Sequence, residues 1–379
     1  MHLLFYIHSL AAGGAERVMV KLANELVQDH NLTLVTQTAI GNEHYPLDPK
    51  VVRISLDAAT PSHSVFSAFT GNWHRIQRLR QVVKRKQPDR ILTFMPTANV
   101  VGVLATLGLD IPVVISERVH PPFASVSNVR RQLQKYAYPR AECTVVLAEQ
   151  SADYLREEFN LTRLAVIPNG VALPLPRSQP TKEPDEVLAP HQRLVLFVGR
   201  MTAQKQPLLA LQAFASAIQA TEDAWHLVMI GDGDMSAEVD AQIAAQSPLP
   251  NNSAISHLTR VGNVQDWYER AAIFLSTSAY EGSPNALMEA MACGAAVIAL
   301  DCPTGPRDLI EHEKNGCLLP LAAQAEVGAS LERLMVNEAL RASFATQARE
   351  VTQTFSDERF LQSWRQVLGL ADQPLGETL

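Results

Sequence analysis

The sequence predicts an α/β protein made of two doubly wound, Rossmann-like domains in tandem. The chain has 379 residues, a length that suits two domains better than one. Short apolar runs alternate with longer amphipathic stretches through both halves, a pattern typical of βα units and parallel sheets. Hydrophobic residues make up 47% of the chain and charged residues 19%, which supplies enough apolar material for two cores and excludes a disordered protein.

Each half contributes six expected strands. In the first half we place them near residues 3–8, 32–37, 90–94, 112–116, 143–147 and 164–167. In the second half they lie near residues 194–199, 226–230, 258–261, 273–276, 296–300 and 317–319. Two such sheets in tandem leave a crevice between their carboxyl edges, where ligands of doubly wound folds bind.

Composition marks the domain boundaries. Residues 173–192 contain five prolines among several charges, which is typical of a linker. We therefore expect an N-terminal acceptor domain at 1–172, a linker at 173–192, a C-terminal donor domain at 193–355, and a terminal helix and tail at 356–379. Apolar residues in the tail follow helical spacing, so this helix is expected to pack back toward the N-terminal domain.

Charge and cysteine usage exclude several classes of protein. The net charge of −7 divides into +5 for residues 1–180 and −12 for residues 181–379, a balance that argues against a nucleic-acid partner. The four cysteines show no metal-ligand spacing, which predicts buried thiols in a reducing, cytoplasmic compartment. The first residues are interpreted as a strand and not a signal peptide. The sequence contains no apolar run of about 18 residues, so no membrane-spanning segment is predicted.

The segment from Ile273 to Gly294 carries the clearest chemistry. A strand leads to the loop of Glu281, Ser283 is expected to cap a helix with proline at its first position, and Gly294 ends it. The N–H groups near Asn285, Ala286 and Leu287 would favour a diphosphate. Glu289 lies inside this helix among apolar neighbours, where its carboxylate can accept hydrogen bonds from ribose hydroxyls. The alternative is an ion pair on a solvated helix face.

Two cations follow the first strand of the second half. Arg200 and Lys205 would hold a leaving diphosphate, and the alternative is two ordinary surface cations. Gly13 and Gly14 follow the first strand of the chain and allow close approach of backbone to a ligand. Their spacing does not match the dinucleotide fingerprint, and no acidic residue ends the second strand, which argues against hydride transfer.

The Glu281-x7-Glu289 pair resembles the motif of family 4 glycosyltransferases, which have the GT-B fold. The resemblance covers nearly the whole chain. Within the family, the sequence is most similar to bacterial members that build lipid-linked oligosaccharides and exopolysaccharides. The supporting motifs are GGAER at 13–17, SER at 116–118, PNG at 168–170, VGR at 198–200, IGDGD at 230–234, VGNV at 261–264 and CPTGPRDLI at 302–310.

This resemblance implies a retaining transfer of a hexose-type sugar from a nucleotide diphosphate-sugar, with UDP as the preferred nucleotide and no metal or other cofactor. The implied catalytic residues are Glu281, Arg200, Lys205 and His120. The implied donor-binding residues are Gly14, Gly199, Arg200, Lys205, Ser283, Asn285, Ala286, Leu287 and Glu289. The implied acceptor-binding residues include Glu16, Arg17, Glu117 and Arg118. This sequence departs from the family at Gln206, a position where relatives often have glycine. The alternative for His120 is a solvated loop histidine without a functional role.

Residues 72–86 form a basic amphipathic pattern that includes Arg75 and Arg78. Such a helix can lie on the cytoplasmic face of an anionic membrane as a peripheral contact. It could also bind the diphosphate of a polyprenyl-linked glycan acceptor, or be an ordinary solvated helix. Two other functions remain open from the residues: a nucleotide-sugar epimerase of the same architecture, and a non-catalytic nucleotide-sugar binding protein.

Overall fold

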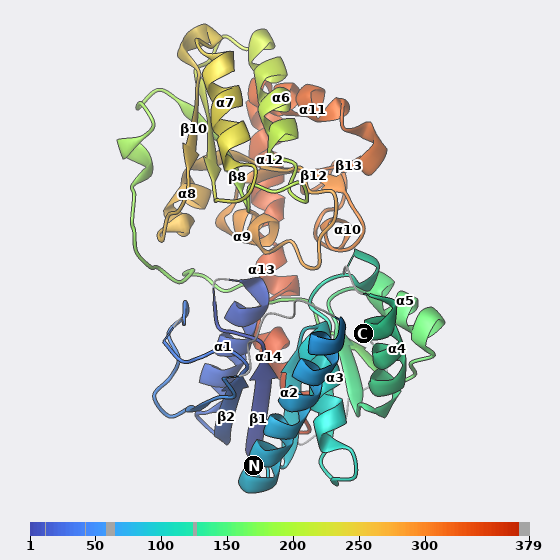
Figure 1. Ribbon diagram of the computed structural model, residues 1–379. Helices are drawn as coiled ribbons and strands as arrows, with labels where there is room; N and C mark the ends of the chain where they lie inside the picture. Colours follow the sequence, from blue (N-terminus) through green and yellow to red (C-terminus); the bar gives the residue numbers. More distant parts are fainter. Residues whose placement is uncertain (12, 42, 58–64, 124–126, 371–379) are drawn as a thin grey trace. The chain divides into compact units, whose positions relative to one another are not determined.

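The computed structural model describes residues 1–11, 13–41, 43–57, 65–123 and 127–370. The chain divides into two compact units (Figure 1). Unit 1 comprises Met1–Asn169 with Glu358–Leu379, and unit 2 comprises Gly170–Asp357. The end of the expected tail, 371–379, lies outside the described residues.

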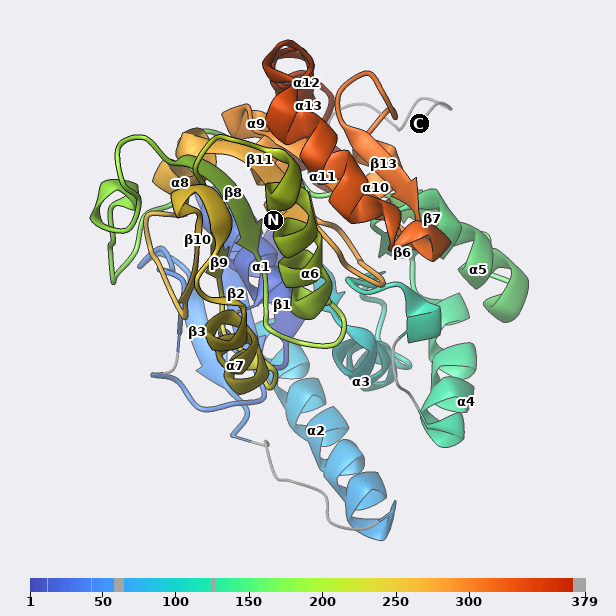
Figure 2. The same ribbon diagram turned by 90° about the horizontal axis from the view of Figure 1, so that it is seen from above.

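Unit 1 is built on a seven-stranded sheet in the order β3-β2-β1-β4-β5-β6-β7, and every pairing between these strands is parallel. The strands are β1 (His2–Ile7), β2 (Asn31–Thr36), β3 (Val52–Ser55), β4 (Arg90–Phe94), β5 (Val113–Ser116), β6 (Cys143–Val146) and β7 (Leu164–Val166). The connecting helices are α1 (Gly14–Leu26), α2 (Val65–Lys86), α3 (Pro96–Thr106), α4 (Asn128–Ala137) and α5 (Glu149–Phe159), and α2 lies beside α3 in Figures 1 and 2. Helices on both faces explain why the central strands are continuous apolar runs.

Unit 2 has a six-stranded parallel sheet in the order β10-β9-β8-β11-β12-β13. Its strands are β8 (Arg193–Val198), β9 (Trp225–Ile230), β10 (Ala254–Leu258), β11 (Ala271–Ser276), β12 (Ala296–Asp301) and β13 (Cys317–Pro320). The helices are α6 (Pro207–Ala217), α7 (Ser236–Gln246), α8 (Val264–Arg270), α9 (Asn285–Cys293), α10 (Pro306–Leu309), α11 (Glu326–Val336), α12 (Glu338–Ala348) and α13 (Val351–Thr354). Figure 2 shows α6 beside α11, and both contribute to one apolar core. Both sheets have the doubly wound order that the sequence predicts.

Two strands differ from the sequence-based expectation. The sequence prediction omitted β3, because its four residues form a partly exposed edge strand without a clear apolar run. The strand expected at 258–261 lies instead at Ala254–Leu258. It ends earlier because the chain turns toward the proline-rich segment: the Gly262 N–H donates to the Pro180 oxygen at 2.6 Å, and the Ser178 N–H donates to the Gly262 oxygen at 2.8 Å.

The C-terminal helix α14 (Asp357–Val367) packs on the sheet of unit 1. Trp364 is fully buried, and its ring lies 5.5 Å from that of Phe94 at the end of β4. At the surface, Arg365 pairs with Asp29 at 3.2 Å. The proline-rich segment 173–192 belongs to unit 2. Among the described helices, none has the length and apolar character needed to cross a membrane.

Candidate functional site

In unit 2 the carboxyl ends of β8 and β11 converge on the start of α9. Helix α9 begins at Asn285 with Pro284 as its N-cap residue, one position later than the sequence predicts. The Ser283 hydroxyl does not cap the helix, since it lies 3.4 Å from the Asn285 side-chain oxygen. The Asn285 N–H donates a hydrogen bond to the Ser283 carbonyl oxygen at 2.9 Å. The N–H groups of Ala286 and Leu287 lie in the first turn, where the helix itself offers no acceptors.

Glu281 is held in the loop before α9 by contacts from two other segments. Its side chain is buried, and its Oε1 atom accepts a hydrogen bond from the Ser278 hydroxyl at 2.7 Å. The Lys205 ammonium donates to the same oxygen in an ion pair. The Thr304 hydroxyl donates to the Glu281 backbone oxygen. The loop is therefore fixed by residues that lie far apart in the sequence.

Lys205 reaches Glu281 because the loop after β8 packs directly on the loop after β11. Gln204 bridges these loops twice: its backbone oxygen accepts the Ala279 N–H at 2.8 Å, and its side-chain amide donates to the Tyr280 oxygen at 2.9 Å. Arg200 is exposed and contacts Gln204 at 3.1 Å. The two predicted phosphate cations thus follow the same strand, and Lys205 already has a carboxylate partner.

Glycines bring the neighbouring strand ends close together. A Cβ atom on Gly231 would lie 2.0 Å from the Gly199 carbonyl oxygen, and its φ of +144° favours glycine. The Gly199 N–H in turn donates to the Ile230 oxygen at 3.0 Å. A Cβ on Gly305 would lie 2.4 Å from Pro284, so the 302–310 motif packs against the start of α9. These contacts require glycine at the edge where the predicted donor residues gather.

Glu289 is buried on α9, so the alternative of a solvated helix face is wrong. Its Oε2 atom accepts a hydrogen bond from the Tyr268 hydroxyl at 3.2 Å. Tyr268 belongs to α8 and stacks edge-on against Phe274 of β11. The carboxylate is therefore oriented from a neighbouring helix.

In unit 1 the predicted acceptor residues follow β5. Glu117 is buried, and its Oε1 atom accepts hydrogen bonds from the Tyr138 hydroxyl and, at 3.3 Å, from the Asn99 amide. Its Oε2 atom is buried without a hydrogen-bond partner among the described residues. Burial raises the pKa of Glu117 to about 7, against the lowering effect of the hydrogen bonds from Tyr138 and Asn99. The Oε2 atom of Glu117 can therefore accept a further hydrogen bond.

Arg118 and His120 are also buried in unit 1. The Arg118 guanidinium donates to the Asn169 side-chain oxygen and lies 5.0 Å from the Phe94 ring, while its Nε and Nη1 atoms have no partner among the described residues. Burial lowers the pKa of Arg118 to about 9. The His120 ring lies 2.8 Å from the Ser151 hydroxyl, and burial lowers its pKa. A simply solvated loop histidine is therefore not what the structure shows.

The remaining predicted residues of unit 1 lie on α1 and α2. Gly14 and Arg17 belong to the first turns of α1, and the Glu16 carboxylate lies where a Cβ on Gly13 would project, 2.2 Å away. On α2, Arg75 is half-buried. Arg78 donates to the backbone oxygens of Leu56 and Asp57, so its charge also serves the packing of unit 1.

Several residues of these sites were not singled out from the sequence. Ser278, Gln204 and Thr304 fix Glu281, and Tyr268 orients Glu289. Thr304 belongs to a motif that the sequence does show, at 302–310. Tyr138 and Tyr268 come from separate helices, and no local spacing signals their contacts.

Comparisons with known proteins agree with this architecture. Residues 13–170 match the glycosyl transferase 4-like domain, and residues 192–337 match glycosyl transferases group 1. A relative from Campylobacter jejuni, the GalNAc-α-(1→4)-GalNAc-α-(1→3)-diNAcBac-PP-undecaprenol α-1,4-N-acetyl-D-galactosaminyltransferase, is 26% identical over 375 residues, with 97% of this chain and 98% of that protein covered. The amylovoran biosynthesis glycosyltransferase AmsD of Erwinia amylovora is 27% identical, covering 94% and 96%.

Solved structures show the same fold. Sucrose-phosphate synthase from Thermosynechococcus elongatus matches with a TM-score of 0.81 at 18% identity, covering 98% of this chain and 100% of that one. HepE of Anabaena in complex with UDP matches with a TM-score of 0.77 at 18% identity and the same coverage. With its two doubly wound sheets and two matching family regions, the chain belongs to the family 4 glycosyltransferases of GT-B fold and is a transferase enzyme.

Proposed function

We propose that the protein is a retaining glycosyltransferase that moves a hexose-type sugar from a UDP-sugar to a glycan or polyprenyl-diphosphate-linked glycan in cell-surface polysaccharide synthesis. The observation that carries this proposal is the Lys205–Glu281 pair beside the first turn of α9. A cation and a helix N-terminus at one place suit a leaving diphosphate. The C. jejuni and E. amylovora relatives are named for an undecaprenol-linked glycan and for amylovoran, and HepE was solved with UDP.

In this mechanism each group of unit 2 has one role. Lys205, Arg200 and the N–H groups of Ala286 and Leu287 stabilise the negative charge that develops on the departing diphosphate. Lys205 and Ser278 both contact Oε1 of Glu281, and we assign Oε2 to a hydroxyl of the transferred sugar.

The remaining donor contacts surround these groups. Glu289, oriented by Tyr268, accepts hydrogen bonds from the ribose. Gly199 allows backbone to approach the donor, as does Gly14 in unit 1. Ser283 and Asn285 complete the donor set at the start of α9.

The bond changes follow from these assignments. The bond between the anomeric carbon and the diphosphate oxygen breaks, and the acceptor oxygen forms a new bond to the same face of that carbon. The proton of the acceptor hydroxyl passes to the departing diphosphate. No metal is part of this proposal, since Lys205 and Arg200 supply the positive charge. In unit 1 we assign His120, Glu117, Arg118, Glu16 and Arg17 to the acceptor side. The Nε and Nη1 atoms of Arg118, which have no partner among the described residues, suit a phosphate oxygen.

The decisive variant is Lys205→Met, with Lys314→Met as a matched control. Lys314 is an exposed lysine of unit 2 that also pairs with a glutamate, Glu311, at 2.7 Å. We expect Lys205→Met to lower UDP release from UDP-sugars by orders of magnitude and Lys314→Met to keep the parent rate. Circular dichroism checks folding, because the Lys205 variant leaves buried Glu281 without its ion pair. Wild-type turnover in a folded Lys205→Met protein would remove the diphosphate assignment.

The donor and the stereochemistry have their own measurements. A thermal-shift screen of UDP-, GDP- and ADP-sugars identifies the nucleotide, because a donor that binds the native state raises the melting temperature. Proton NMR of the first product reports the anomeric configuration, and an inverted product contradicts the retaining mechanism. Release of sugar-nucleotide epimers without an acceptor would instead indicate an epimerase.

We also propose a peripheral membrane contact through residues 72–86. Trp73 is exposed, as are Lys84 and Arg85, whereas Arg78 serves the packing of unit 1. An exposed aromatic residue with basic neighbours suits an anionic lipid surface. Flotation with anionic liposomes should be weaker for the Lys84→Glu/Arg85→Glu variant. Unchanged flotation would contradict this contact.

A further inference from the structure

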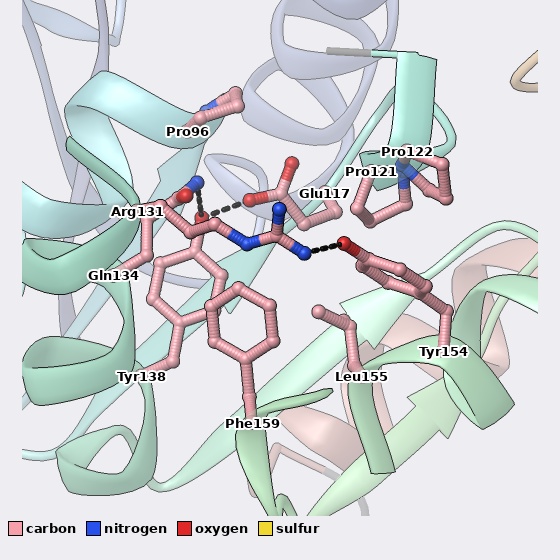
Figure 3. A pocket seen from close by; sticks show the side chains of 10 residues that line it. All are labelled: Pro96, Glu117, Pro121, Pro122, Arg131, Gln134, Tyr138, Tyr154, Leu155 and Phe159. Carbon is pink, nitrogen blue, oxygen red and sulfur yellow. Dashed lines mark hydrogen bonds between the residues drawn. The ribbon is translucent and has the colours of Figure 1, made fainter. Parts of the chain in front are cut away.

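A pocket of about 220 Å³ lies within unit 1 at the carboxyl edge of its sheet. Its polar lining comes from Glu117 after β5, Arg131 and Gln134 of α4, and Tyr154 of α5, and Figure 3 shows these side chains gathered around one space. Ligands of doubly wound sheets bind at this edge. The volume is below the range of about 300–1,000 Å³ that is typical of drug-sized ligands, so the pocket suits one ring and not a whole nucleotide.

The walls combine flat apolar surfaces with a few polar groups. The Phe159 and Tyr138 rings stack with centroids 5.8 Å apart, and Leu155 and three prolines, including Pro96 at the start of α3, complete the lining. A sugar ring has the matching character, because its C–H faces are apolar and its rim carries hydroxyl groups. Aromatic side chains with a polar tip are suited to such ligands.

Two polar groups of the pocket have unused hydrogen-bonding capacity among the described residues. Glu117 is 2% exposed, and its Oε2 atom has no partner there. Its Oε1 atom is occupied by Tyr138, which also accepts from Gln134 at 3.1 Å, so the carboxyl cannot turn without breaking these bonds. The Tyr154 hydroxyl accepts from Arg131 at 2.6 Å, and accepting leaves its own hydrogen to donate. Glu117 and Tyr154 thus offer one acceptor and one donor to a ligand.

The charges of the pocket argue for an uncharged ligand. Arg131 is the cation of the lining, and its guanidinium already pairs with Glu158 at 3.0 Å. Glu117 contributes a carboxyl group, which repels an anionic ligand when it is ionised. The buried Glu117 carboxylate therefore disfavours a phosphate or a uronic acid in this pocket.

We propose that this pocket binds one uncharged sugar residue of the acceptor glycan, with Glu117 Oε2 accepting from the sugar and the Tyr154 hydroxyl donating to it. The inference rests on the proposed transfer reaction only in naming the ligand as the acceptor. It makes the preferred substrate a glycan and not a bare lipid phosphate. It also makes Glu117 and Tyr154 specificity-determining residues of unit 1.

Saturation-transfer NMR on the full-length protein tests this proposal. The probes are the methyl α-glycosides of glucose, galactose and their N-acetyl derivatives, with methyl glucuronide and glycerol 3-phosphate as anionic probes. At least one neutral glycoside should bind the wild type more tightly than both anions. At about pH 8, above the pKa of Glu117, Glu117→Gln should weaken its binding about tenfold, because a hydrogen bond to a carboxylate is replaced by an amide donor. Tyr154→Phe should weaken it several-fold.

Two control variants make the same chemical changes outside the pocket. Glu157→Gln alters an exposed glutamate of α5, and Tyr136→Phe removes a hydroxyl from an exposed tyrosine of α4. Both should bind the glycoside within about twofold of the wild type. If Glu117→Gln does not fold, Tyr154→Phe against Tyr136→Phe carries the test.

Three results would overturn the proposal: no neutral glycoside binding at tens of millimolar, equal binding by both pocket variants and the wild type, or a preference for the anions. UDP-sugar binding is measured separately by thermal shift. If a glycoside binds through Glu117 while no nucleotide-sugar binds, the proposed donor reaction fails and the sugar pocket stands. The opposite result removes the pocket and keeps the donor reaction.

Discussion

Replacing Glu117 by glutamine should change how the free energy of unfolding depends on pH. Burial raises the pKa of Glu117 from 4.5 to about 7, and the hydrogen bonds from Tyr138 and Asn99 only partly oppose this. Between these two pKa values the native protein retains a proton that the unfolded chain has released. The native state therefore loses stability as pH rises from about 4.5 to about 7, and then no further from this group. A pKa difference of this size corresponds to about 3 kcal/mol.

Urea unfolding at several values between about pH 5 and pH 8 measures this effect. Hydrogen exchange of peptides from unit 1 reports the relevant unit separately from unit 2. The glutamine amide introduces its own cost at the position of Oε2, but that cost is the same at every pH. The quantity to compare is thus the change with pH of the difference between Glu117→Gln and the wild type.

As pH rises from about 5 to about 8, the free energy of unfolding of Glu117→Gln should increase relative to that of the wild type by about 2–3 kcal/mol. Glu157→Gln, on the exposed face of α5, should show a nearly constant difference from the wild type. A change below about 1 kcal/mol for Glu117→Gln would mean that the carboxyl is well solvated, and the reasoning from its burial would be refuted.

Five further substitutions test the backbone and the packing by urea denaturation. Gly231→Ala should cost more than about 2 kcal/mol, because its Cβ would overlap the Gly199 oxygen, whereas Gly108→Ala has a positive φ but open space and should cost about 1 kcal/mol. Trp364→Ala should destabilise unit 1 by about 3–5 kcal/mol, since the ring is fully buried. Gln206 has a left-handed backbone with a φ of +50°, so Gln206→Gly should change stability by less than about 1 kcal/mol and Gln206→Val should cost more than about 2 kcal/mol. Equal costs for Gly231→Ala and Gly108→Ala would contradict the overlap at Gly231. Equal costs for Gln206→Gly and Gln206→Val would contradict the left-handed backbone at Gln206.

Most strands could be located from the sequence because the central strands of both sheets are buried on two faces. A strand such as β9, with all six residues buried, leaves an apolar run from Leu227 to Ile230 in the sequence. The edge strands β3 and β10 leave a weaker signal: β3 has no buried residue and β10 is half-buried throughout. The order of elements is therefore recoverable from hydrophobic patterning, while the edges depend on contacts that patterning does not record.

For the site residues, the sequence predicts which loops they occupy but not which side chains they contact. The sequence places Glu281 and Lys205 in loops after parallel strands, and parallel strands bring their carboxyl ends to one edge. It does not predict that both meet at one oxygen with Ser278, because that depends on how Gln204 ties the two loops together. Likewise, a basic helix at 72–86 is evident, but the use of Arg78 to bind backbone oxygens of a preceding loop is not.

The two units differ in how their sites are built, and this bears on how substrate preference can change. In unit 2, Glu281 is fixed through its backbone as well as its side chain, by Thr304 and by the Pro303 oxygen at 3.5 Å, so substitution there disturbs the loop itself. In unit 1, Glu117 and Tyr154 present side chains from separate elements into one pocket, at the edge of a parallel sheet that is paired through backbone groups. Side chains of that kind can be exchanged without remaking the backbone. Variation of the pocket in unit 1 should therefore alter the acceptor while the groups of unit 2 continue to hold the same donor.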